Sequence, residues 1–133
     1  MIAAVRVVQK QSFECFYDRA SGRTFADAEF RRCSFLSSAI SITRDPPLRS
    51  IVRNVRLIDC EQRGCAVDTA IVENVLVDGL KTNGLLQTWG AVFKHVIIRG
   101  KVGRIMISPA VATGTATAAQ QRAFDEANAA YYE

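Results

Sequence analysis

One six-residue pattern returns four times along this chain and constrains its fold more than any other feature. An apolar residue comes first, followed by a charged residue, a polar residue, a small apolar residue, a variable residue and a second apolar residue. The pattern occupies residues 30–35, 52–57, 72–77 and 93–98, and successive copies start 22, 20 and 21 residues apart. A repeat of this length indicates a chain built from stacked copies of one structural unit.

The residues inside the pattern favour strands that wind into a coil. Val55, Val75 and Val96 share one position of the repeat. Because side chains alternate between the faces of a strand, we expect these valines to point inward and to lie directly over one another in successive turns. The fold predicted is all-β: a right-handed parallel β-solenoid of about five coils with a C-terminal capping helix.

A finer period of five residues is visible between residues 25 and 40. Large apolar side chains occur at every fifth position, and small ones stand two positions before the last three of them: Phe25, Phe30, Phe35 and Ile40, with Ala28, Cys33 and Ser38. This resembles the pentapeptide-repeat proteins, whose chain forms a four-sided right-handed solenoid. Further along, Gln62, Thr82 and Gln87 interrupt the frame, so a three-sided β-helix of the pectate-lyase shape stays open.

The chain divides into three predicted segments. Residues 1–24 are expected to form an N-terminal cap and first coil, residues 25–109 the β-solenoid, and residues 110–133 a linker and a C-terminal helix. The turn at Asp45-Pro46-Pro47 is expected to hold the two extra residues of the 22-residue spacing. Thr117 and Gln120 form a predicted capping box at the start of the helix.

Composition is consistent with a single folded domain, with 49% hydrophobic and 23% charged residues. The four cysteines show no CxxC spacing, so we expect free thiols rather than disulfides or a zinc site. The apolar stretch after Met1 is too short for a signal peptide, and no run of apolar residues is long enough for a transmembrane helix. The expected location is cytoplasmic, with no membrane association.

Residues typical of catalysis are few and dispersed. His95 is the only histidine, and it occupies the repeat position also held by Arg32, Asn54 and Asn74, which indicates a polar turn residue. Enzymes with β-helix folds that cleave polysaccharides use clustered acids, for which Asp59, Asp68 and Asp78 are the candidates. Our alignment of the repeats puts Asp59 and Asp78 in different columns. We therefore predict no catalytic residue, no metal and no cofactor.

Outward positions of the repeat become apolar toward the C-terminal half, and the terminal helix presents an apolar face. The predicted interface consists of Ile51, Ile71, Val92, Leu76, Ile97, Phe124 and Tyr131. An exposed apolar stripe of this kind marks an interaction surface. The alternative is that the terminal helix or the N-terminal segment covers the stripe within the same chain.

These features predict a non-enzymatic protein-interaction or structural module that resembles the pentapeptide-repeat proteins. Its partner would be another protein or a second copy of the chain, as in a homodimer. One alternative is a carbohydrate-active β-helix of the lyase or hydrolase type. Another is weak nucleic-acid binding through Arg31, Arg53 and Lys94, which the repeat aligns in one column interrupted by Glu73, although a net charge of +4 is modest for that purpose.

Overall fold

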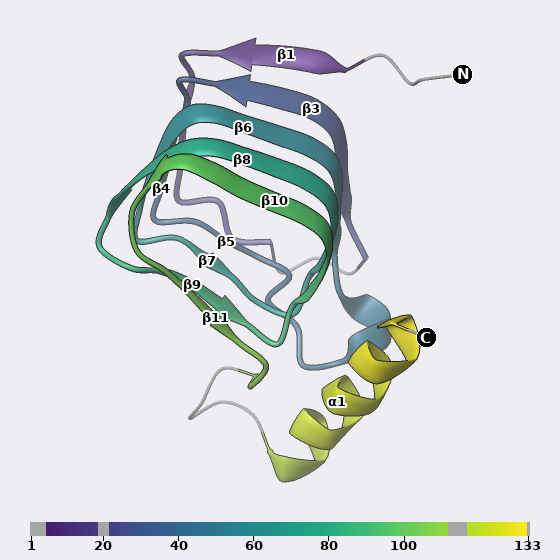
Figure 1. Cartoon of the computed structure of the whole chain (residues 1–133). Helices are drawn as coiled ribbons and strands as arrows, with labels where there is room; N and C mark the ends of the chain where they lie inside the picture. Colours follow the sequence, from purple (N-terminus) through teal and green to yellow (C-terminus); the bar gives the residue numbers. More distant parts are fainter. Residues whose placement is uncertain (1–4, 19–21, 112–116, 133) are drawn as a thin grey trace.

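The computed structural model describes residues 5–18, 22–111 and 117–132 and shows a parallel β-solenoid of about five turns (Figure 1). A 3-10 helix, η1 (Pro46–Leu48), interrupts the second turn, and one α-helix, α1 (Ala118–Tyr132), follows the last. The strands are β1 (Arg6–Gln9), β2 (Ser12–Glu14), β3 (Thr24–Arg31), β4 (Ser34–Leu36), β5 (Ala39–Ile40), β6 (Ile51–Arg63), β7 (Ala66–Val67), β8 (Ile71–Asn83), β9 (Leu86–Trp89), β10 (Val92–Val102) and β11 (Ile105–Ser108).

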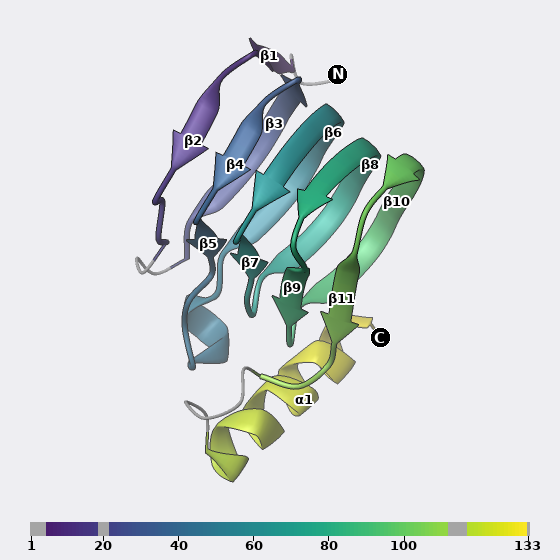
Figure 2. The same ribbon diagram turned by 90° about the vertical axis from the view of Figure 1, so that its left-hand side faces the viewer.

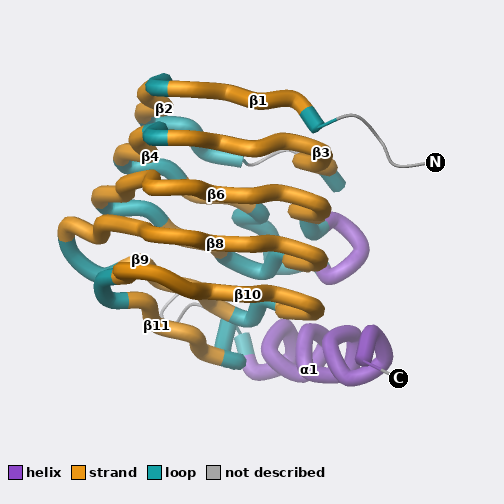
Figure 3. The backbone as a smooth tube through the Cα atoms, turned by 45° about the horizontal axis from the view of Figure 1, so that its top comes forward, coloured by secondary structure: helices purple, strands orange, loops and turns teal. Residues whose placement is uncertain are grey.

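The second to fifth coils contribute strands to two parallel sheets, and the first coil contributes β1 and β2 to the larger one only. In the larger sheet β1, β3, β6, β8 and β10 pair in that order, and β2 and β4 continue it along the second half of β6. In the smaller sheet β5, β7, β9 and β11 lie side by side (Figure 2). The tube in Figure 3 follows successive coils stacked along one axis. This arrangement leaves β1 at one end of the stack and β10 at the other.

The central prediction of the repeat is confirmed by the strand register. Val55 pairs with Val75, and Val75 pairs with Val96, so the three valines form one column. The first two are only 6% and 7% exposed, and Val75 packs in the main hydrophobic cluster with Val72, Val77 and Leu80. Burial of these aliphatic columns inside the coil is the main source of stability in such a fold.

The polar position of the repeat is a corner of the coil. Asn54, Asn74 and His95 have φ angles of 53°, 53° and 54°, and Asp27 has 57°. Asparagine, aspartate and histidine are enriched in this left-handed region among non-glycine residues. The Asn54 side-chain amide donates to Asp27 at 2.7 Å, so polar contacts link corners of successive coils. Left-handed residues recur five positions further along each coil, as in the series Asn74, Gly79 and Gly84.

The predicted alignment of the first copy of the repeat is wrong by five residues, which is one side of the coil. Phe30 pairs with Leu57, and it is Phe25 that pairs with Val52. That coil is therefore 27 residues long instead of 22, and η1 lies in the additional segment (Figure 1). The five-residue period made one side of the coil resemble the next, which is why the motif matched at the wrong side.

The predicted capping box at the start of α1 is confirmed. The Gln120 backbone amide donates to the Thr117 hydroxyl at 3.1 Å, and the Thr117 amide donates to the Gln120 side chain at 2.8 Å. These reciprocal bonds satisfy amides that have no partner within the helix. Of the linker predicted before the helix, residues 112–116 lie outside the described residues.

Candidate functional site

The last turn of the solenoid, residues 92–108, has no described strand stacked on its outer side, and we call it the end coil. Three isoleucines of this coil are exposed: Ile97 by 57%, Ile98 by 42% and Ile107 by 59%. Ile98 continues the inward column of Leu57 and Val77, and Val77 is only 8% exposed. Ile98 is exposed because the described chain provides no further coil to cover it, so the hydrophobic core is open at this end.

Helix α1 covers part of this end through polar contacts with the backbone. The Tyr132 hydroxyl accepts from the Phe93 amide at 2.9 Å and donates to the Phe93 carbonyl at 3.1 Å. Asn128 donates to the Gly90 carbonyl at 3.1 Å. A single phenol thus satisfies the two backbone groups of Phe93 that a neighbouring strand would otherwise bind.

Beyond Phe93, no described strand pairs with the outer edge of β10. At the matching corner of earlier coils the backbone amide donates to the following coil: Lys10 donates to the Arg31 carbonyl at 2.9 Å, and Arg32 donates to the Ile58 carbonyl at 3.0 Å. Gly100 occupies this corner in the end coil and has the same left-handed backbone, with φ of 76°. By analogy with these corners, we expect its amide to point toward the position of a sixth coil, where an added strand could accept from it.

Only part of the predicted apolar stripe is exposed to solvent. Ile51 and Ile71 are half-buried, whereas Val92 is fully buried, so its assignment as an exposed interface residue is wrong. Val92 pairs with Ile71 and lies between Gly90 and Phe93, the two residues that α1 binds. The alternative of a covering helix from the same chain applies here. Leu76 is half-buried and Ile97 is exposed, so the accessible part of the stripe is on the end coil.

The two predicted interface residues of the helix contact the solenoid instead of remaining free. Phe124 is fully buried, and the guanidinium of Arg49 lies 5.9 Å from its ring centroid. Tyr131 donates to Glu73 at 2.7 Å. Burial, together with this hydrogen bond, raises the pKa of Tyr131. Both side chains hold α1 against the flank of the solenoid, because an apolar helix face gains stability only by burial.

None of the candidates for catalysis is brought into a reactive arrangement in the described part of the chain. His95 is an exposed corner residue. Asp59 stacks with Gly79, as the repeat predicted, while Asp78 pairs with Arg99, whose Nε lies 3.1 Å from the carboxylate. Asp68 is buried in the third coil, and this burial raises its pKa.

The cysteines and the basic column also bear on the function. Cys33 and Cys60 are buried free thiols, and burial raises the pKa of Cys60.

The predicted basic column is wrong at its first member, since Arg31 pairs with Ile58. Arg53 and Lys94 share a column with Glu73 between them, so charge alternates there instead of accumulating as a nucleic-acid surface requires.

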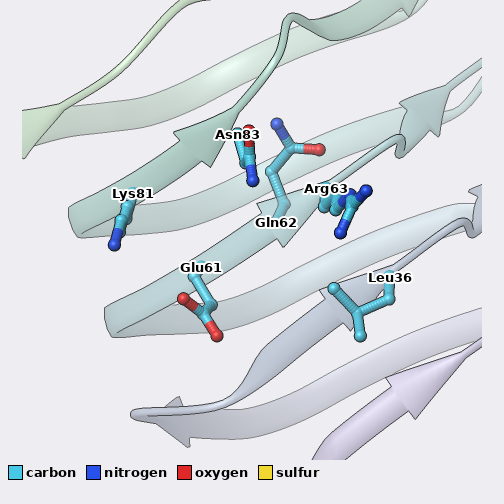
Figure 4. A pocket seen from close by; sticks show the side chains of 6 residues that line it. All are labelled: Leu36, Glu61, Gln62, Arg63, Lys81 and Asn83. Carbon is cyan, nitrogen blue, oxygen red and sulfur yellow. The ribbon is translucent and has the colours of Figure 1, made fainter.

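Two hollows among the described residues are notable, and neither is lined by His95, Asp59, Asp68 or Asp78. One is lined by Leu36, Glu61, Gln62, Arg63, Lys81 and Asn83 (Figure 4). Figure 4 shows Glu61 and Gln62 leaving β6 in opposite directions. Gln62 is 3% exposed, and its side chain accepts from the Cys65 amide at 3.1 Å, so its role is structural. The second hollow lies between the end coil and α1, where Phe93, Ile107 and Tyr132 form an apolar wall.

A buried polar cluster was not predicted from the sequence. Asp18 is 1% exposed and accepts from the Ser50 hydroxyl at 2.5 Å and from the Ser41 amide at 3.1 Å. Arg23 lies 3.6 Å from its other carboxylate oxygen. Ser41 and Ser50 flank the segment that contains η1, and the cluster fixes this segment against the first coil. No repeat position marks Asp18, so periodicity alone offered no signal for it.

No protein-family model matches this sequence, and neither a curated protein nor a solved structure shows significant similarity to it. Within the described residues, no helix combines the length and the apolar character needed to cross a bilayer. A functional assignment must therefore be argued from the structure itself, in which the end coil is the exposed apolar surface.

Proposed function

We propose that this chain is a non-enzymatic interaction module that binds protein through the end coil of its β-solenoid. The observation that supports this most strongly is the exposure of Ile98, by 42%, at a column that is buried in the preceding coil. Exposed apolar side chains beside an open strand edge favour association, because both the apolar area and the backbone groups gain from a partner.

Resemblance to the pentapeptide-repeat proteins is consistent with this role. The left-handed residues Asn54, Asp59 and Gly64 recur at five-residue intervals, in agreement with the five-residue period of the sequence. Proteins of that type use the flat faces and ends of a solenoid as binding surfaces. The partner of the end coil is either a different protein or a second copy of the chain.

The experiment is selection of short random peptides on the immobilised chain, together with the solution mass measured by light scattering. The test variant combines Ile98→Lys and Ile107→Lys. The control combines Val7→Lys and Tyr17→Lys, which change two residues that are each 51% exposed near the first coil. We expect peptides, or a defined oligomer, that bind through the end coil and are lost only in the test variant.

Circular dichroism establishes that each variant keeps the fold. A test variant with unchanged peptide binding and unchanged solution mass would contradict the proposal. The same conclusion follows if the wild-type chain is monomeric and selects no peptide.

A further inference from the structure

Charge alternates along the stacking direction in the columns that reach the end coil. In one column Arg53, Glu73 and Lys94 follow one another in successive coils. The Arg53 Nε lies 3.9 Å from the Glu73 carboxylate. In the neighbouring column Asp78 is followed by Arg99, and their side chains are 3.1 Å apart. Opposite charges on adjacent strands stabilise a sheet, and like charges destabilise it.

The end coil terminates both columns with a positive residue. Lys94 and Arg99 lie on β10, and Lys101 and Arg104 add two exposed positive charges nearby. The sequence contains no aspartate or glutamate between Asp78 and Asp125. Among the described residues, no ion pair engages Lys101 or Arg104. The open edge of β10 is therefore basic as well as apolar.

The strand already paired with β10 shows which sequence this edge accepts. On its inner side β10 binds β8 in parallel, with Glu73 beside Lys94, Val77 beside Ile98 and Asp78 beside Arg99. A strand on the outer, opposite edge of β10 would place its side chains in the same columns as those of β8. It therefore needs an acidic residue over Arg99 and a β-branched residue over Ile98, since Tyr132 already binds the Phe93 backbone beside Lys94.

A second copy of this chain fits the edge poorly. Two end coils facing one another would bring Lys101 and Arg104 of each copy together, and such juxtaposition of like charges is unfavourable. The described first coil does not supply the missing negative charge, because Arg6 and Lys10 balance Glu14 and Asp18. Charge complementarity thus favours a different protein over self-association.

We propose that the end coil binds an extended acidic segment of another protein, which adds to β10 as a parallel strand and forms the first side of a sixth coil. This inference rests on the proposed function and specifies the partner's chemistry. From its corner position we expect the Gly100 amide to donate to the added strand, and main-chain hydrogen bonds of this kind provide affinity while side-chain columns provide specificity. Residues near Phe93 are excluded from pairing, because Tyr132 already binds that backbone.

The probe is a fluorescent peptide that copies residues 75–83 of this chain, with glutamate at the position of Lys81. The comparison peptide has lysine at each acidic position. The test variant combines Lys101→Glu and Arg104→Glu. The matched control combines Arg6→Glu and Lys10→Glu, which makes the same change in net charge at the opposite end of the solenoid. Circular dichroism verifies the fold of both variants.

We expect fluorescence anisotropy to show binding of the acidic peptide to the wild-type chain and to the control. Affinity should fall by about tenfold or more in the test variant, and it should weaken as salt is added. The lysine peptide should bind at least about tenfold more weakly. Hydrogen exchange should show new protection of the Gly100 amide in the complex.

Equal binding of the two peptides, or no binding of the acidic one, would overturn the inference. Duplex DNA that binds more tightly than the acidic peptide and loses affinity in the test variant would replace it with nucleic-acid recognition. If selected peptides of other composition bind through Ile98 and Ile107, the proposed function stands and only the acidic partner is wrong. If changing those isoleucines alters no binding, the proposed function itself fails.

Discussion

Truncation of one valine in the central column provides a direct measure of the solenoid core. Val75 is 7% exposed and lies between Val55 and Val96. Val75→Ala removes two methyl groups, which corresponds to a transfer free energy of about 1.6 kcal/mol. The cavity that remains adds on the order of 1 kcal/mol. We therefore expect the free energy of unfolding to fall by about 2–3 kcal/mol.

The measurement is equilibrium unfolding in urea followed by circular dichroism, with unchanged dependence on denaturant as the check that the same surface unfolds. Ile97→Ala is the matched control on the next coil, because Ile97 faces outward and is 57% exposed. It should cost less than about 1 kcal/mol. Val96→Ala should lie between the two, since only one coil stacks on Val96. Equal losses at Val75 and Ile97 would refute the inward column.

Three further predictions concern burial elsewhere in the molecule. Burial raises the pKa of Asp68, and Arg44 lowers it in part, so the folded state binds the proton more tightly than the unfolded state. Stability therefore falls as pH rises through the folded pKa. Asp68→Asn should raise the melting temperature at pH 7 and lose this advantage near pH 4, whereas a lower melting temperature at pH 7 would contradict the reasoning. Cys15, which is exposed, should react with a thiol reagent in the native protein, while Cys60 should react only in urea, and equal native rates would show that the core is not closed around it. Phe124→Ala should undock α1 and lower the free energy of unfolding by about 3 kcal/mol or less, because the solenoid remains folded. Hydrogen exchange should become faster in the helix and at Val92. Unchanged exchange at both would indicate that Phe124 does not hold the helix in place.

The repeat made the interior predictable but not the ends. The spacing of 20 and 21 residues identified the Val55, Val75 and Val96 column, because stacked coils require equivalent residues at each turn. The same logic failed at Phe30, where a five-residue period within the coil made its sides interchangeable. The sequence also pointed to α1 and its capping box, which depend on local interactions between neighbouring residues.

The sequence alone determined the strands, the corners and the inward columns, because each depends on contacts between residues at a fixed spacing. Only the tertiary structure decided which apolar residues stay exposed. Val92 and Ile97 read alike in the sequence, yet Val92 is buried beside Gly90 and Phe93, which α1 binds, whereas Ile97 stays in solvent. The burial of a side chain depends on what folds back over it, and the docking of a distant helix is a long-range contact that no local spacing encodes.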